Sequence, residues 1–136
     1  MQEALVKTWK NIRMAIPMTV GILMIISILN PILKNYYARI FTGNYFIDPF
    51  IGALAGSITF GIPITSYITG GELLKSGVSL LAVTAFVYAW TTVGVVMLPL
   101  EMSFLGKRFA IVRNSLNFVF SILVAILTML TLNLFK

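Results

Sequence analysis

Long apolar runs separated by short polar stretches make up most of the chain. Three of these runs, 14–33, 78–98 and 111–135, are about 20 to 25 residues long and carry almost no charge. A helix of about 20 residues is about 30 Å long, which matches the hydrocarbon core of a bilayer. The pattern therefore predicts an all-α, polytopic membrane protein with three full transmembrane helices, built as one domain over residues 1–136.

The stretch 48–77 departs from this pattern. It holds six of the ten glycines and two prolines, so an unbroken helix is not expected. Asp48 and Pro49 are a helix start signal, since the carboxylate can cap free N–H groups and proline fits the first turn. Pro63 disfavours helical geometry in the residue before it, so the first helix should end shortly before Pro63. A second helix then runs from Pro63 to about Lys75. Each half is about 18 Å long, too short to cross a bilayer alone.

Two topologies fit this stretch: a re-entrant helical hairpin, which leaves three full spans, or a fourth span broken in its middle. The positive-inside rule weighs them. The hairpin puts six Lys and Arg residues on one side of the membrane and four on the other, whereas a fourth span puts five on each side. The count favours the hairpin, but it is nearly balanced, so we expect insertion in both orientations.

The N-terminal residues carry interface signals. Over residues 2–13 the apolar side chains share one helical face and the basic ones share the other, which predicts a short helix lying in the membrane interface. The alternative is a frayed tail. Basic residues before an apolar run are also typical of a secretory signal, but no small-residue cleavage site follows Leu33, so we expect the span 14–33 to be retained.

Composition excludes an ordinary soluble domain. Hydrophobic residues make up 59% of the chain and charged residues 10%, against about 25% charged residues in soluble domains. The mean hydropathy is +0.97. The formal net charge is +6, but the basic residues stand at the ends of apolar runs, which indicates contact with lipid headgroups rather than with nucleic acid. We therefore expect a multi-pass protein of the cell membrane.

Residues for catalysis and for metal binding are scarce. The chain has no His, no Cys and four acidic residues, which leaves little for general acid–base or nucleophilic chemistry. We predict neither an enzyme nor a bound metal or cofactor.

Helix breaks inside a membrane must be shielded from lipid by protein or by a water-filled cavity, because each unpaired N–H or C=O group in hydrocarbon costs several kcal/mol. Three spans are too few to enclose a polar hairpin, so we predict a homo-oligomer. An odd number of crossings plus a hairpin is also what half of an inverted-repeat transporter has. A homodimer of antiparallel subunits would supply the other half, and the near balance of Lys and Arg favours it over a parallel pair.

Hydroxyl groups are the candidate ligands in the broken stretch. Together with the free N–H groups of half-helix N-termini they suit a small polar or anionic solute. The candidate substrate-binding residues are Ser57, Thr59, Gly61, Pro63, Thr65, Ser66, Tyr67 and Glu72. The alternative for the hydroxyls is that they only satisfy backbone groups freed by the break. Glu72 is either a proton carrier at bilayer depth or a hydrated residue on the same helical face as Lys75.

Two later runs carry small or polar residues at helical spacing. In 78–98, a small face suited to close packing consists of Ala82, Ala85, Ala89 and Thr92, and a polar face consists of Thr84, Tyr88 and Thr91. In 111–135, a polar stripe consists of Asn114, Asn117, Ser121 and Thr128. Amides in lipid need partners, so this stripe faces protein or water, and interhelical hydrogen bonding explains it without a substrate.

Three segments resemble one known family. They are GSITFGIPI from Gly56, GELLKSGVS from Gly71 and AVTAF from Ala82. The glycine-and-proline break, followed by a Leu-Leu-x-x-Gly step into the next span, resembles the predicted-permease family that includes the organoarsenical efflux permeases. The resemblance covers about a third of the chain and implies a half-size member of that family. The chain has no Cys to bind trivalent arsenic, which argues against that substrate.

We therefore predict a permease-like transporter of a small polar or anionic solute that works as a homo-oligomer in the lipid bilayer. The alternative is a non-transporting membrane subunit or scaffold, in which the broken stretch packs against a different protein. These two hypotheses differ in whether the helix break lines a pathway or an interface.

Overall fold

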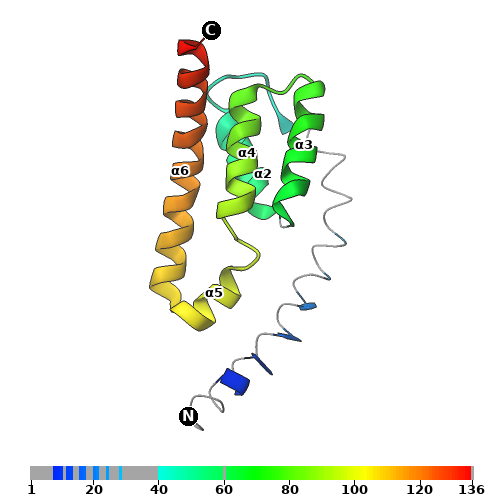
Figure 1. The fold of residues 1–136 in the computed structure, drawn as a ribbon. Helices are drawn as coiled ribbons and strands as arrows, with labels where there is room; N and C mark the ends of the chain where they lie inside the picture. The colour runs from blue at the N-terminus through cyan, green and yellow to red at the C-terminus, as the bar shows by residue number, and fades with distance from the viewer. Residues whose placement is uncertain are drawn as a thin grey trace.

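The computed structural model describes residues 40–59 and 61–135, together with isolated residues at 8–10, 12–13, 16–17, 20–21, 24 and 28. The helices of this part are α2 (Asp48–Ile58), α3 (Pro63–Lys75), α4 (Leu80–Thr92), α5 (Leu98–Leu105) and α6 (Lys107–Leu134) (Figure 1). The predicted all-α class is confirmed for these residues. The predicted interfacial helix over 2–13 and the predicted span over 14–33 lie outside the described residues, apart from the isolated positions.

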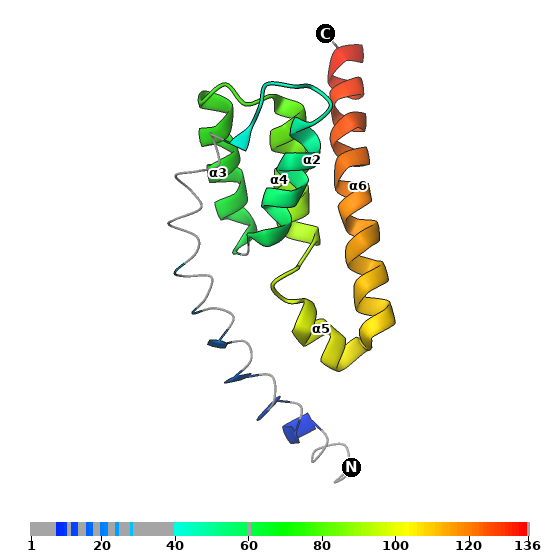
Figure 2. The ribbon, with the colours of Figure 1, turned by 180° about the vertical axis from the view of Figure 1, so that it is seen from behind.

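The stretch 48–77 folds as two helices joined by a short break. α2 ends at Ile58, and α3 begins at Pro63 with the preceding residue, Ile62, in an extended conformation. The break falls where Pro63 predicts it, because proline disfavours helical geometry in the residue before it. α2 and α3 run in opposite directions, so the stretch starts and finishes at the same end of the molecule (Figure 1, Figure 2). This is a helical hairpin, and its place in a bilayer stays a prediction.

The start of α2 differs from the prediction in one detail. Asp48 is buried, but its carboxylate does not cap α2. Its Oδ1 accepts hydrogen bonds from the backbone N–H and the hydroxyl of Thr42, at 2.9 and 2.8 Å, and its Oδ2 accepts one from the Gly43 N–H at 3.0 Å. Ile47 already has helical backbone angles. Asp48 therefore lies inside the first turn, and its side chain reaches back to fix the preceding loop.

Glycines bring α2 and α4 into direct contact. A methyl group on Gly52 would collide with the carbonyl oxygen of Ala82, and a methyl group on Gly56 would collide with that of Phe86. Because Gly52 meets Ala82 and Gly56 meets Phe86, the two helices run parallel. The alanines of the predicted small face are completely buried: Ala82, Ala85 and Ala89. The three alanines of the small face therefore pack closely, as predicted, and their partners include a helix of the same chain, whereas Thr92, the fourth member, is exposed.

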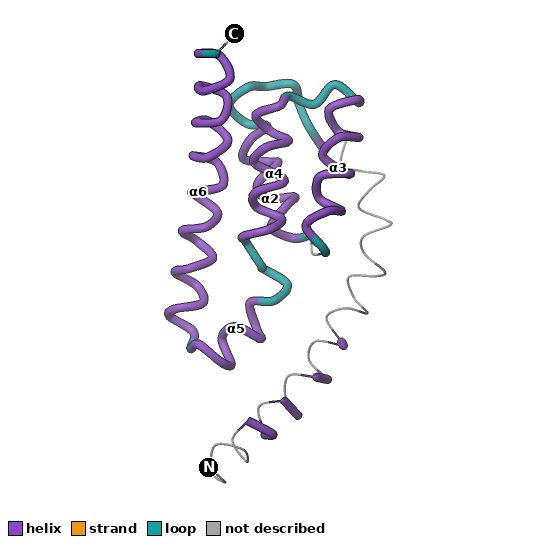
Figure 3. The backbone as a smooth tube through the Cα atoms, viewed as in Figure 1, coloured by secondary structure: helices purple, strands orange, loops and turns teal. Residues whose placement is uncertain are grey.

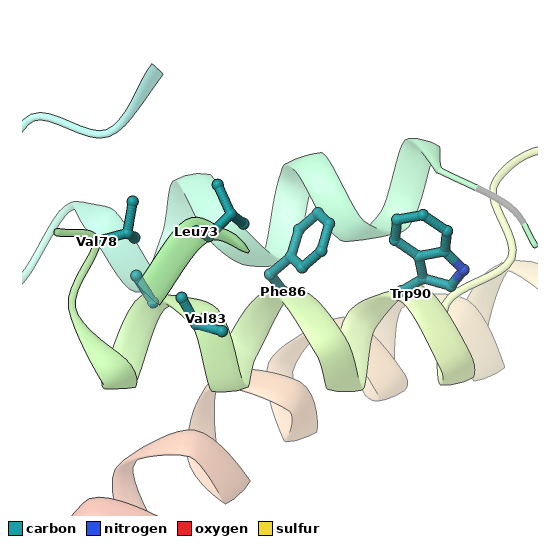
Figure 4. Close-up of a cluster of buried hydrophobic side chains, with 6 residues drawn as sticks. Leu73, Val78, Val83, Phe86 and Trp90 are labelled. Atoms are coloured by element: carbon teal, nitrogen blue, oxygen red, sulfur yellow. The ribbon is translucent and has the colours of Figure 1, made fainter. Parts of the chain in front are cut away.

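Larger side chains, most of them from α4, form a cluster where α4 meets α3. The cluster there consists of Leu73, Val78, Ala82, Val83, Phe86 and Trp90 (Figure 4). The rings of Phe86 and Trp90 meet edge to face with their centroids 5.3 Å apart. The indole N–H of Trp90 donates a hydrogen bond to the carbonyl oxygen of Gly61 at 3.4 Å. This contact joins the end of α4 to the break between α2 and α3.

α4 is shorter than the span predicted over 78–98. The helix ends at Thr92 after 13 residues, or about 20 Å, and residues 93–97 form a loop that leads to α5 (Figure 3). The prediction of an unbroken span here is wrong. The sequence from Thr91 to Val96 is rich in β-branched residues and includes Gly94, and both kinds of residue lower helix propensity. Side chains from α6 also satisfy the backbone groups that the early end of α4 frees.

α6 is the longest described helix, and most of its apolar stretch is exposed. It has 28 residues and is about 42 Å long. It begins at Lys107 rather than at the predicted Ile111, because Gly106, with φ +86°, turns the chain between α5 and α6. Among the described helices, α6 alone is long and apolar enough to cross a membrane, and only 11% of its most apolar stretch is buried. The other predicted spans are therefore either interrupted or outside the described residues.

Candidate functional site

Three buried hydroxyl groups of the hairpin bond to backbone groups close to them in the sequence. Ser57, Thr59 and Ser66 each donate a hydrogen bond to a backbone carbonyl oxygen three or four residues earlier, at 2.6, 2.7 and 2.7 Å. All three side chains are buried. Since their hydrogen atoms are used inside the protein, these contacts support the interpretation that the hydroxyls satisfy backbone groups around the break.

The remaining predicted site residues do not gather around one point. Gly61 and Thr65 are half-buried, whereas Pro63, Tyr67 and Glu72 are exposed. Ser57 lines a groove between α2 and α6, and Tyr67 lines a different groove between α3 and α4. The candidate substrate-binding residues are therefore divided between two surfaces and the interior of the hairpin.

Glu72 lies on the exposed side of α3. Lys75 is also exposed, and within the described residues these two side chains form no ion pair with each other. The exposed position fits a hydrated carboxylate better than a proton carrier enclosed by protein.

A second helix break lies beside the first, at the end of α4. The side-chain amide of Asn117 donates a hydrogen bond to the carbonyl oxygen of Thr92 at 2.8 Å, and the N–H of Gly94 donates one to Asn114 Oδ1, also at 2.8 Å. A continuous helix would satisfy both backbone groups internally. The prediction that the polar stripe of α6 makes interhelical hydrogen bonds is confirmed for these two amides.

The other members of the stripe behave differently. Ser121 donates a hydrogen bond to the carbonyl oxygen of Phe118 at 2.7 Å, and Thr128 donates one to that of Val124 at 2.8 Å. Both bonds stay within α6. The interhelical part of the stripe is therefore confined to the level of the second break.

An acidic residue on α5 holds the same junction together. Glu101 Oε1 pairs with the guanidinium of Arg113, and Glu101 Oε2 accepts a hydrogen bond from Asn114 Nδ2 at 2.8 Å. Asn114 thus connects α5, α6 and the loop after α4. Sequence reasoning missed the role of Glu101. The available signal was that Glu101 is the only acidic residue after Glu72, in a region with three basic residues at the start of α6.

Neither the acidic side chains nor the buried Thr69 hydroxyl forms a ligand site within the described residues. Among the described residues, no three His, Cys, Asp or Glu side chains come together as a metal site. Within the same part of the chain, Thr69 Oγ1 on α3 is a buried polar atom without a hydrogen-bond partner. One unpaired hydroxyl can hold a water molecule but does not define a binding site.

The groove between α2 and α6 is almost entirely apolar. Its volume is about 570 Å³. The apolar residues that line it are Phe50, Leu54, Ile58, Val93, Val95, Leu98, Ile111, Phe118 and Val119, and the polar ones are Ser57, Asn114 and Ser115. Such a surface suits an acyl chain or an apolar helix rather than a polar solute.

The groove between α3 and α4 is smaller and carries more hydroxyl groups. Its volume is about 330 Å³. Its hydroxyl-bearing residues are Tyr67, Thr84, Tyr88 and Thr91, and its other lining residues are Gly70, Gly71, Leu74, Leu80, Val83 and Val87. The polar face predicted for 78–98 and the predicted site residue Tyr67 therefore line the same groove.

Comparisons with protein-family models, with curated proteins and with solved structures give no match to this chain. The resemblance to the predicted-permease family therefore stays a prediction from the quoted segments.

Proposed function

We propose that the chain is a permease-like membrane transporter of a small polar solute and that it works as a homo-oligomer. The observation that carries the proposal is the presence of two helix breaks at one level beside α6. One break joins α2 to α3, and the other follows α4. The hydrogen bond from Trp90 to Gly61 links the two breaks directly.

Positions along α6 give an estimate of how deep these breaks would lie in a bilayer. Asn117, which bonds the last residue of α4, lies about 15 Å along α6 from Lys107 and about 26 Å from Leu134. A hydrocarbon core of about 30 Å centred on α6 would begin about 6 Å inside each end of the helix. The break after α4 would then lie about 9 Å within the hydrocarbon.

Helix breaks at that depth are typical of transporters. Non-helical backbone inside a bilayer is tolerated where protein or a water-filled cavity covers it. Paired discontinuous helices that meet inside the bilayer build the solute sites of many secondary transporters. The resemblance of the segment from Gly56 to Ile64 to the predicted-permease family supports the same class of function.

A partner subunit is part of the proposal. The small face of α4 packs inside the chain, so assembly would use other surfaces, and the exposed apolar side of α6 is the candidate. An antiparallel homodimer would place a second pair of breaks opposite the first. Such a dimer needs both orientations in the membrane, which the near balance of Lys and Arg permits.

The transport proposal is tested by a flux assay. Liposomes containing the purified chain are mixed with hyperosmotic glycerol, glucose or potassium gluconate, and solute entry is followed by light scattering. We expect at least one solute to enter faster than into empty liposomes. Asn117→Leu, which leaves the Thr92 carbonyl bare, should slow that entry about tenfold, whereas Thr131→Val on the exposed side of α6 should not. If all three solutes enter no faster than into empty liposomes, the transport proposal is wrong.

The orientation of the subunits is tested by charge. Added Lys residues at one end or the other should force the chain into one orientation or its opposite. Each biased form alone should lose flux, and a mixture of the two should regain it. Full flux from one form alone would contradict the antiparallel dimer.

A non-transporting membrane subunit or scaffold is the second candidate function. It is favoured by the almost wholly apolar groove between α2 and α6, which suits a helix of a different protein. The flux assay separates the two candidates, because a scaffold would give no solute entry. We propose no enzymatic activity and no cofactor for either candidate.

A further inference from the structure

We infer that the groove between α3 and α4 is the solute site and that its solute is an uncharged small molecule bearing several hydroxyl groups. This inference rests on the proposed transport function and names the class of solute. It narrows the sequence-based prediction, which allowed an anion.

The site is built by two helices that present hydroxyl groups to each other. Thr84, Tyr88 and Thr91 recur at spacings of four and three residues, so they share one face of α4. Tyr67 comes from the first turns of α3, on the other wall of the groove. Thr91 is one residue from the end of α4, so the groove reaches the level of the two helix breaks.

The hydrogen-bonding capacity of these groups fits a hydroxylated solute. Thr84 and Thr91 donate to backbone carbonyl oxygens of α4 at 2.7 and 3.0 Å, which leaves their oxygen atoms as acceptors. The phenol groups of Tyr67 and Tyr88 make no hydrogen bond within the described residues, so they can both donate and accept. A sugar-like hydroxyl group, which also donates and accepts, matches both kinds of partner.

The walls of the groove carry no charge. None of its lining residues is Lys, Arg, Asp or Glu, and the nearest acidic residue in sequence, Glu72, follows the lining residue Gly71 without lining the groove itself. An ion bound in the groove would gain no counter-charge from its lining, whereas a neutral polar molecule can form hydrogen bonds with the hydroxyl groups. The lining therefore selects against charged solutes.

Two neighbouring glycines have different roles in this groove. A methyl group on Gly70 would touch the side chains of Val87 and Val83 at 3.0 and 3.1 Å, so Gly70 allows α3 to approach α4. A methyl group on Gly71 would have no atom within 4 Å. Gly71 therefore leaves free space in the groove, and a larger residue there can fill the site without displacing a helix.

The test measures binding to three probes of similar size and different charge: glucose, gluconate and glucosamine. The chain is placed in lipid nanodiscs, and binding is measured by saturation-transfer difference NMR. We expect saturable binding of glucose and at least tenfold weaker binding of the two charged probes. Failure of glucose to bind, or equal binding of a charged probe, would overturn the inference.

Variants locate the binding. Tyr67→Phe and Tyr88→Phe should each weaken glucose binding about three- to tenfold by removing one hydrogen-bonding group, and Gly71→Leu should abolish it. Tyr45→Phe, in an exposed loop away from the groove, is the matched control and should bind like the parent protein. Glucose binding that none of the groove variants changes would place the site elsewhere.

The same variants separate this inference from the transport proposal. Glucose binding without flux would contradict the transport proposal but support the binding site in the groove. Flux that Gly71→Leu does not alter would contradict the binding site in the groove but support the transport proposal.

Discussion

Two apolar regions of the molecule differ in the size and burial of their side chains. One is the contact between α2 and α4, and the other is the outer side of α6. α2 and α4 meet through Gly52, Gly56 and three fully buried alanines. α6 instead carries large side chains, and only 11% of its most apolar stretch is buried. α2 and α4, which are too short to cross a bilayer, are packed through small residues, whereas the helix that is long enough satisfies its own backbone and leaves most of its side chains exposed.

The polar residues of the two regions follow the same division. In α2 and α3 the buried serines, Ser57 and Ser66, bond within their own helices. On α6, Asn114 and Asn117 bond across to the loop after α4 and to its last residue. The two asparagine side chains therefore bond to backbone groups that the early end of α4 leaves free. The two serine hydroxyls bond to carbonyl oxygens of their own helices.

The largest expected effect is at the glycine contact. Gly56→Leu would force its side chain against the backbone of α4 at Phe86, which cannot move aside as a flexible side chain can. We expect the free energy of unfolding in detergent to fall by about 3 kcal/mol or more. Thermal unfolding followed by circular dichroism measures this change. Gly71→Ala, at an open helical position, is the control and should be neutral or slightly stabilising. Equal stability of the two variants would refute the close contact.

The next effect in size is at the second break. Asn114→Leu keeps the side chain branched at Cγ but removes the acceptor for the Gly94 N–H and one donor to Glu101. We expect a loss of about 2 kcal/mol in the free energy of unfolding, because polar groups at the junction are left unpaired. Ser115→Ala, on the exposed neighbouring residue, should change the same quantity by less than about 0.5 kcal/mol. A neutral Asn114→Leu would mean that the network does not support the break.

A smaller effect is expected from the buried hydroxyls. Ser57→Ala and Ser66→Ala each remove a hydrogen bond to a carbonyl oxygen of the same helix. We expect each to cost about 1 kcal/mol or less and to leave solute flux within about twofold of the parent rate. A tenfold loss of flux without a loss of stability would show that these hydroxyls bind the solute.

The smallest effect is expected on the outer side of α6. Leu127 is 59% exposed, whereas Ala125, two residues earlier, is completely buried. Leu127→Ala should change the free energy of unfolding of the isolated chain by less than about 0.5 kcal/mol. Ala125→Leu should cost about 1 to 3 kcal/mol by overpacking. A large effect of Leu127→Ala on the isolated chain would contradict the exposed position of this side chain.

The first break was predictable from the sequence and the second was not. Pro63 acts on its immediate neighbours, so its effect is local and visible in the sequence. The end of α4 at Thr92 depends on Asn114 and Asn117, which lie more than twenty residues later. The weak helix propensity after Thr91 was a signal, but an apolar run of spanning length masked it.

The candidate site shows the same limit. Tyr67 and the polar face of α4 were each recognisable by residue type and spacing. Their meeting across one groove depends on how α3 packs against α4, which Gly70 sets through tertiary contact. The use of Ser57 and Ser66 inside the hairpin likewise depends on which side of each helix is buried.

The depth of the two breaks is the central claim, and spin labels test it directly. Because the chain has no Cys, single substitutions Ile62→Cys and Val95→Cys give one label in each break. Both native side chains are exposed in the isolated chain, so the labels should not disturb packing. Labels at Asn44 and Ser76 mark the two ends of the hairpin.

The measurement is the accessibility of each label to oxygen and to a polar nickel complex in lipid bilayers, which gives its depth. The account predicts that labels 62 and 95 lie within the hydrocarbon at similar depths, with labels 44 and 76 together at one interface. Labels 62 and 95 in the headgroup region, or labels 44 and 76 on opposite sides of the membrane, would contradict it.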